Sequence, residues 1–109
     1  MDIKVVDFKG VKIIEPTGDI DMYSSPALRK ELMSFVNKKI PVLFIDFKGV
    51  SYIDSSGIAT FVESLKGMKS YGGRLKLLGI PPKIVEIFSF SKLDKVFDIC
   101  GSIEDALNS

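Results

Sequence analysis

The sequence predicts an α/β protein in which a mixed, mostly parallel sheet of about four to five strands packs with about four helices. Strand-like apolar runs alternate along the chain with segments whose apolar residues recur at helical spacing. Residues 42–45 (Val-Leu-Phe-Ile) are continuously apolar, which is typical of a strand covered on both faces of a sheet. The 109-residue length suits one core, so we expect a single domain over residues 1–109 with the order β-β-α-β-α-β-α-β-α.

The chain is expected to open with an antiparallel hairpin. Apolar and charged residues alternate imperfectly over residues 3–8, Lys9-Gly10 is a turn signal, and a second strand follows that ends at Pro16. Residues 17–21 (Thr-Gly-Asp-Ile-Asp) then read as a loop, because turn-forming residues replace the apolar pattern.

Two helices are expected on either side of the central strand. Ser24 is the expected cap of the first, and Pro26 stands in its first turn, where a missing N–H does no harm. Residues 46–53 are interpreted as a connection that leads into the second helix. Apolar residues at helical spacing mark both helices, namely Leu28, Leu32, Phe35 and Val36 in the first and Ile58, Phe61, Val62, Leu65 and Met68 in the second.

The remaining elements are short. Gly72-Gly73 stops the second helix, and the leucines of residues 75–78 predict a strand. Pro81-Pro82 opens a short helix. Residues 96–100 predict a last strand and residues 103–107 a terminal helix.

The composition excludes several classes of function. The net charge of +1 gives no broad basic surface, so nucleic acid is a poor candidate partner. The chain has no histidine, which excludes Ser-His-Asp and Cys-His catalysis and histidine-based zinc sites. It also lacks the GxxxxGK[ST] and GxGxxG loops that bind phosphates. We therefore expect neither an enzyme nor a protein with a cofactor or metal of its own.

The chain also indicates a compartment. Its single cysteine, Cys100, cannot form an internal disulfide and is expected to pack in the core of a protein from a reducing compartment. No stretch approaches the ~20 apolar residues of a membrane span, and the first ten residues do not resemble a signal peptide. A cytoplasmic protein without a membrane segment is expected.

The candidate site lies where the second helix is expected to begin. Ser55 and Ser56 follow Asp54 there, and Ser55 is interpreted as the N-cap. The unpaired N–H groups and positive dipole end of a helix start would tolerate a phosphate on Ser55. Asp19 and Asp21 would share this edge of the sheet if their strand neighbours the central one. The local pattern leaves an alternative open, in which Asp-Ser-Ser-Gly only caps a helix and the two aspartates are turn residues.

Two motifs carry a family resemblance. Residues 17–21 resemble the first loop, Gly-acidic-apolar-Asp, of the STAS family of anti-sigma-factor antagonists. Residues 52–58 (Tyr-Ile-Asp-Ser-Ser-Gly-Ile) resemble that family's phosphorylation loop, and residues 72–75 and 87–93 also fit family positions. Because the motifs occur in this order and span nearly the whole chain, the sequence resembles a STAS domain throughout.

The resemblance implies a function. The unphosphorylated antagonist would bind an anti-sigma factor that is also a serine kinase and so release the sigma factor. The kinase would use its own bound ATP and Mg²⁺ to phosphorylate Ser55, phosphorylation would end the binding, and a separate serine phosphatase would reset the protein. The alternative is a STAS scaffold or regulatory module, in a stress-signalling or transport complex, that does not switch. A monomer is expected in either case.

The same resemblance assigns expected roles to the neighbours of Ser55. Asp54 would orient the serine hydroxyl or shape the loop, and Ser56, also the second choice of phosphoacceptor, would shape the helix start together with Gly57. Five residues of the first loop and the helix start after it complete the expected partner-binding or phosphosite-shaping set, with Ser24 expected as a structural cap: Asp19, Asp21, Met22, Tyr23 and Ser24. Two alternatives remain open for Met22 and Tyr23: their side chains are exposed and contact the partner, or they fold back onto the core.

Overall fold

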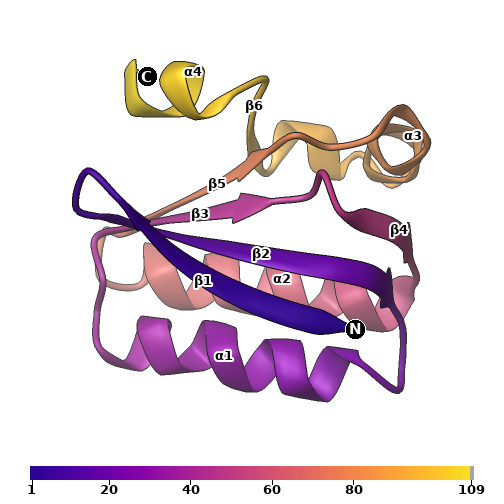
Figure 1. Ribbon diagram of the computed structural model, residues 1–109, viewed down its shortest axis with the longest axis horizontal. Helices are drawn as coiled ribbons and strands as arrows, with labels where there is room; N and C mark the ends of the chain where they lie inside the picture. Colours follow the sequence, from indigo (N-terminus) through magenta and orange to yellow (C-terminus); the bar gives the residue numbers. More distant parts are fainter. Residues whose placement is uncertain (109) are drawn as a thin grey trace.

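The computed structural model describes residues 1–108, in which six strands form one mixed sheet that packs with four α-helices (Figure 1). The strands are β1 (Asp2–Phe8), β2 (Val11–Ile20), β3 (Val42–Asp46), β4 (Val50–Ile53), β5 (Arg74–Leu78) and β6 (Asp98–Cys100). The helices are α1 (Ser25–Asn37), α2 (Ser55–Lys69), α3 (Pro82–Phe90) and α4 (Ile103–Asn108), with a single 3₁₀ turn at Leu93–Lys95. The α/β class and the mostly parallel sheet are as predicted.

The strand order is β1-β2-β3-β5-β6, and β4 pairs with β2 beside this path. The β1–β2 pair is the predicted antiparallel hairpin, whereas all other pairs are parallel. The parallel crossovers are made by α1, α2 and the α3 segment, so the carboxyl ends of the parallel strands point toward one edge, where the ends of β2 and β4 pair at Ile20 and Ile53. That edge lies on the right-hand side of Figure 1, where α1 and α2 begin.

Three predicted boundaries are wrong, and two of them lie in the first half of the chain. The second strand does not end at Pro16 but continues to Ile20, and residues 50–53 form β4 rather than part of a connection. The long β2 pairs with β3 at residues 12–14 and with β4 at residues 18–20. Pro16 falls in the gap between these two parallel ladders, where a residue without an N–H costs little.

The third boundary error is at the last strand, which begins at Asp98 and not at residue 96. The 3₁₀ turn occupies the preceding segment after Lys92, whose left-handed backbone (φ 61°) ends the α3 region. Phe97 is buried in the core ahead of the strand, so the apolar pattern there reports core packing and not strand pairing.

The sheet separates two apolar clusters. On one face α1 and α2 lie side by side (Figure 1). Arg29 and Glu63 join them through paired guanidinium–carboxylate contacts of 2.6 and 2.8 Å. The larger cluster also takes in α3, whose Phe88 ring stands edge-on to Phe47 and Phe97 at 6.0 and 5.7 Å between centroids. This core fixes the positions of the loops at the carboxyl edge.

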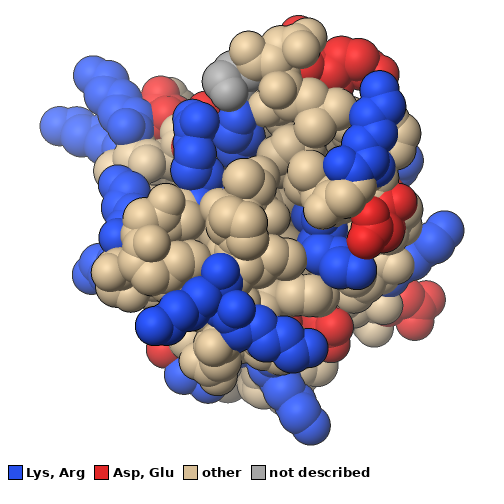
Figure 2. Space-filling model, turned by 90° about the vertical axis from the view of Figure 1, so that its left-hand side faces the viewer, with Lys and Arg blue, Asp and Glu red and all other residues tan. Residues whose placement is uncertain are grey.

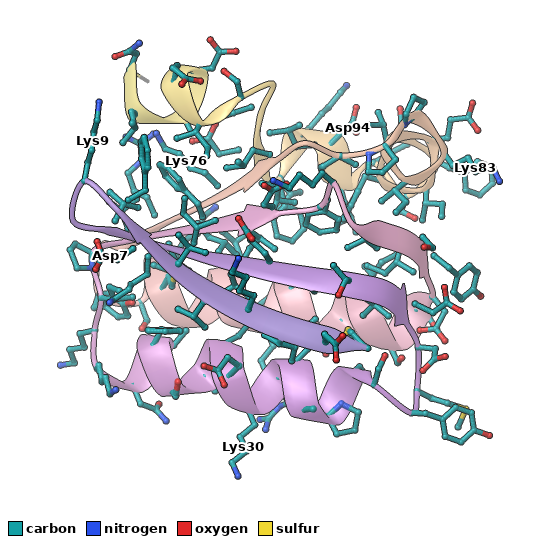
Figure 3. All side chains as sticks on the ribbon, in the orientation of Figure 1. Asp7, Lys9, Lys30, Lys76, Lys83 and Asp94 are labelled. Atoms are coloured by element: carbon teal, nitrogen blue, oxygen red, sulfur yellow. The ribbon has the colours of Figure 1, made fainter. Side chains whose placement is uncertain are left out.

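The smaller cluster lies under α4 on the other face of the sheet. Cys100 is half-buried against it, in agreement with the expected packing role. Lys76 is buried between β5 and α4, and its Nζ donates to the carbonyl of Ala106 at 2.7 Å (Figure 3). A cation at the end of a helix offsets the negative end of the helix dipole, so Lys76 helps to hold α4 on the sheet. None of the helices within residues 1–108 is long and apolar enough to cross a membrane.

Candidate functional site

The two predicted loops meet at the carboxyl edge, by which we mean residues 19–25 and 52–57. Ile20 and Ile53 are paired as the last residues of β2 and β4, and the Asp54 N–H donates to the Ile20 carbonyl at 3.1 Å. The starts of α1 and α2 follow immediately from these strand ends. Strand pairing therefore brings together two segments that are distant in the sequence. The condition set for this in the sequence, that β2 neighbours the strand of residues 42–45, is met, and the unpredicted β4 makes the contact closer.

Asp54, and not Ser55, is the N-cap of α2. Its backbone is extended (φ −112°), and its Oδ1 accepts hydrogen bonds from the N–H groups of Ser56 at 2.9 Å and Gly57 at 3.3 Å. The prediction that Ser55 caps the helix is wrong because a carboxylate one residue earlier reaches the same donors. Ser55 is instead the first residue of the helix, and its side chain is exposed.

The carboxylate of Asp54 is held in its charged form. The Ser56 hydroxyl donates to it at 2.6 Å and is the largest cause of a pKa below the ordinary aspartate value. Backbone N–H groups of Gly57, Ser56 and Met22 lower this pKa further, against partial burial, which raises it. Met22 belongs to the first loop, so the interaction of its backbone N–H with the Asp54 carboxylate also connects the two loops.

The two serines of the motif have different surroundings. Ser56 is half-buried. Its oxygen accepts a hydrogen bond from the Ser25 hydroxyl at 3.3 Å, and its own hydroxyl donates a hydrogen bond to Asp54. Within residues 1–108 no hydrogen bond engages the hydroxyl of Ser55. Of the two candidate phosphoacceptors, Ser55 is the one whose hydroxyl is accessible from outside.

Gly57 is required by close packing. A Cβ at this position would stand 2.6 Å from Cγ2 of Ile20, 2.8 Å from Cγ1 of Ile53 and 3.2 Å from the Ile20 carbonyl oxygen. The first turn of α2 therefore presses directly on the ends of β2 and β4. The glycine has a negative φ, so it is the approach and not the backbone conformation that excludes a side chain.

The first loop is a turn built on Asp21. Its Oδ1 accepts from the N–H groups of Tyr23 at 2.9 Å and Ser24 at 3.1 Å. Ser24 occupies the N-cap position of α1, but its hydroxyl donates to the Asp19 carbonyl at 2.7 Å and accepts from the Asp21 N–H at 3.0 Å. The predicted cap position is right, whereas the expected capping hydrogen bond is absent because the hydroxyl closes the turn instead.

Exposed apolar side chains accompany the carboxylates. Met22 and Tyr23 are 65% and 86% exposed, so they do not fold back onto the core. Tyr52, which sequence reasoning treated only as a flanking residue, is 50% exposed and pairs with Asp19 across β2 and β4. Exposed aromatic residues are common anchors of protein interfaces. No signal in the sequence indicated this exposure, because Tyr52 and Ile53 are both apolar and lie in a segment interpreted as a connection.

The charges of the molecule are distributed unequally. The carboxyl edge carries Asp19, Asp21 and Asp54. Figure 2 shows the opposite end, where Lys and Arg side chains, with fewer Asp and Glu side chains among them, surround a central uncharged area. That end holds the β1–β2 turn with Lys9 and the last turns of α1 and α2 (Figures 1 and 3). A phosphate added at Ser55 would therefore enter the acidic end of the molecule.

We next compared the sequence and the fold with those of known proteins. The STAS domain family model matches residues 2–106. An anti-sigma-B factor antagonist of Bacillus subtilis is 37% identical over 87 residues, which are 80% of this chain and 79% of that protein.

Two solved structures have the same fold. The crystal structure of a putative anti-sigma factor antagonist from Thermotoga maritima superposes with a TM-score of 0.91 at 24% identity, covering 97% of this chain and 92% of that one. The Bacillus cell fate determinant SpoIIAA in its phosphorylated form superposes with a TM-score of 0.75 at 19% identity, covering 98% and 97%. The family match, the relative and the shared fold lead to one conclusion: the chain belongs to the STAS domain family, among its anti-sigma factor antagonists.

Proposed function

We propose that this antagonist binds an anti-sigma factor with serine-kinase activity through the carboxyl edge, and that phosphorylation of Ser55 ends this binding. The kinase supplies ATP and Mg²⁺, and a separate serine phosphatase restores the unmodified form. The exchange takes place in the cytoplasm, where sigma factors act. The observation that carries the proposal is the difference between the two serines, since Ser55 is exposed and Ser56 is engaged with Asp54 and Ser25.

The modification is a phosphoryl transfer. The Ser55 Oγ attacks the γ-phosphorus of ATP, an Oγ–P bond forms, the bond to the β-phosphate oxygen breaks, and ADP leaves. The hydroxyl proton passes to a base of the kinase. Asp54 is a poor candidate for that base because its carboxylate already accepts hydrogen bonds and its pKa is lowered.

The fold tolerates the product. Ser55 is the first residue of the fifteen-residue helix α2, so a phosphate there lies at the positive end of the helix dipole. The phosphate adds a charge of about −1.5 to −2 at neutral pH. We expect the backbone of residues 1–108 to stay nearly unchanged on phosphorylation, and a large change in amide chemical shifts far from α2 would contradict this.

The interface does not tolerate the product equally well. A partner that fits the unmodified edge already meets the charges of Asp19 and Asp21 and the exposed Met22 and Tyr23. A phosphate at the centre of such a contact is desolvated without a matching cation. Each 1.4 kcal/mol of lost binding free energy is about a tenfold loss of affinity, so a loss of several kcal/mol suffices to release the partner.

The test is intact-mass measurement with site mapping after incubation of the protein with ATP and a lysate of the source cells. We expect a single added phosphate on Ser55, no phosphate in Ser55→Ala, and a phosphate retained on Ser55 in Ser56→Ala. Phosphate on Ser56 of the native protein would refute the assignment of the acceptor. No phosphate from a lysate whose kinase activity is demonstrated would favour the scaffold alternative, in which Asp54 and Ser55 only begin a helix.

A further inference from the structure

A chain of hydroxyl groups connects the starts of the two long helices. Ser25 is the first residue of α1, and its hydroxyl donates to the Ser56 hydroxyl of α2 at 3.3 Å. Ser56 in turn donates to Oδ1 of Asp54 at 2.6 Å. The chain ends on the carboxylate that caps α2, the helix whose first residue is Ser55.

Ser25 is buried, at 7% exposure, although it stands beside the exposed Pro26 and one residue after the turn built on Asp21. A buried hydroxyl needs a hydrogen-bond partner, and the partner that it finds belongs to a different helix, thirty-one residues along the chain. The neighbouring Ser24 serves its own loop instead. Ser25 thus joins α1 to the Asp-Ser-Ser-Gly motif by a hydrogen bond.

The contact has a chemical consequence for Ser56. Its hydroxyl donates a hydrogen bond to Asp54, and its oxygen accepts a hydrogen bond from Ser25. A hydroxyl that accepts a hydrogen bond becomes a better donor, because hydrogen bonds in a chain polarise one another. Ser25 therefore strengthens the hydrogen bond from Ser56 to Asp54, and it occupies a lone pair of the Ser56 oxygen.

We propose that Ser25 is a positioning residue for the modification of Ser55, acting through Ser56 on Asp54 so that the motif presents one accessible hydroxyl. The proposal rests on the proposed function and adds to it a residue outside the Asp-Ser-Ser-Gly motif. The side-chain hydrogen bond of Ser25 within residues 1–108 goes to Ser56 and not to Ser55. Its effect reaches the acceptor only along the hydroxyl chain.

A double-mutant cycle tests the order of the chain. The variants are Ser25→Ala, Ser56→Ala and the double variant, and the control is Ser34→Ala, because Ser34 lies on α1 but donates within its own helix to Glu31. The first readout is the pKa of the Asp54 carboxyl, measured by carbon-detected NMR titration. We expect it to rise in Ser56→Ala, to rise less in Ser25→Ala, and to be unchanged in Ser34→Ala. In the Ser56→Ala background, Ser25→Ala should have no further effect.

The second readout is the rate of phosphate uptake at Ser55 with ATP and lysate kinase. Loss of one weak neutral hydrogen bond corresponds to about a two- to threefold slower rate in Ser25→Ala. A Ser25→Ala protein with the native Asp54 titration and the native rate overturns the inference while the proposed function stands. So does an effect of Ser25→Ala that persists in the Ser56→Ala background. Absence of phosphate on the native protein overturns both. The melting temperatures of all variants, measured alongside, show that each one folds.

Discussion

Replacing Gly57 by alanine tests whether α2 is seated on the strand ends as closely as the structure indicates. The added Cβ would stand 2.6 Å from Cγ2 of Ile20 and 2.8 Å from Cγ1 of Ile53, distances that force atoms to move. The Ile20 carbonyl oxygen, at 3.2 Å, belongs to a paired strand and cannot move freely. Relief requires α2 to shift away from β2 and β4, and with it the Asp54 cap.

The magnitude follows from two opposing effects. Overpacking a core site costs about 1–3 kcal/mol. Alanine in place of glycine in a helix returns roughly 0.5–1 kcal/mol. The net loss is roughly 0–2.5 kcal/mol of unfolding free energy, and its middle value of about 1 kcal/mol corresponds to about 4–8 °C in melting temperature for a domain of this size.

Urea unfolding followed by far-ultraviolet circular dichroism measures this loss. The matched control is Gly67→Ala in the same helix, where the new Cβ would meet only one methyl carbon of Val36 at 2.8 Å, with its other neighbours at 3.9 Å. That variant gains the same helix preference and should lie close to the native stability. A Gly57→Ala protein at least as stable as the Gly67→Ala protein would refute the close seating of α2.

Two further predictions concern the cap and the core. The pKa of Asp54 is lowered by the Ser56 hydroxyl and by backbone N–H groups. The contribution of this carboxylate to stability is therefore present above the ordinary pKa of 3.8 and is lost as the pH falls through the lower pKa of the folded state. Urea unfolding from neutral to acid pH should show the native protein losing stability relative to Asp54→Asn over that interval, and a pH-independent difference would contradict the prediction. Phe88→Ala should lower the unfolding free energy by about 3–5 kcal/mol, because the ring is fully buried against two other phenylalanines. Phe90 is 93% exposed, so Phe90→Ala should change the unfolding free energy by less than about 0.5 kcal/mol. Equal losses in the two variants would contradict the placement of α3.

The order of most elements could be predicted because the signals are local. Apolar spacing within a dozen residues defines α1 and α2, and a continuous apolar run defines β3. β4 was missed because it has four residues, and only the two at its ends, Val50 and Ile53, are buried. So short a segment shows no period of its own and becomes a strand only by pairing with the second half of β2. The same pairing carries β2 past Pro16.

The candidate site divides in the same way. The motif, its place at a helix start and the family resemblance are properties of consecutive residues. The sequence by itself therefore determined that Ser55 is the expected phosphoacceptor and that Asp19, Asp21 and Asp54 are its expected neighbours. Tertiary structure decided which atom caps α2, that Ser56 turns inward to Asp54 and that Ser25 reaches it from another helix. Exposure and hydrogen bonding between distant segments depend on how strands pair and helices pack, and the order of residues along a chain does not record those distances.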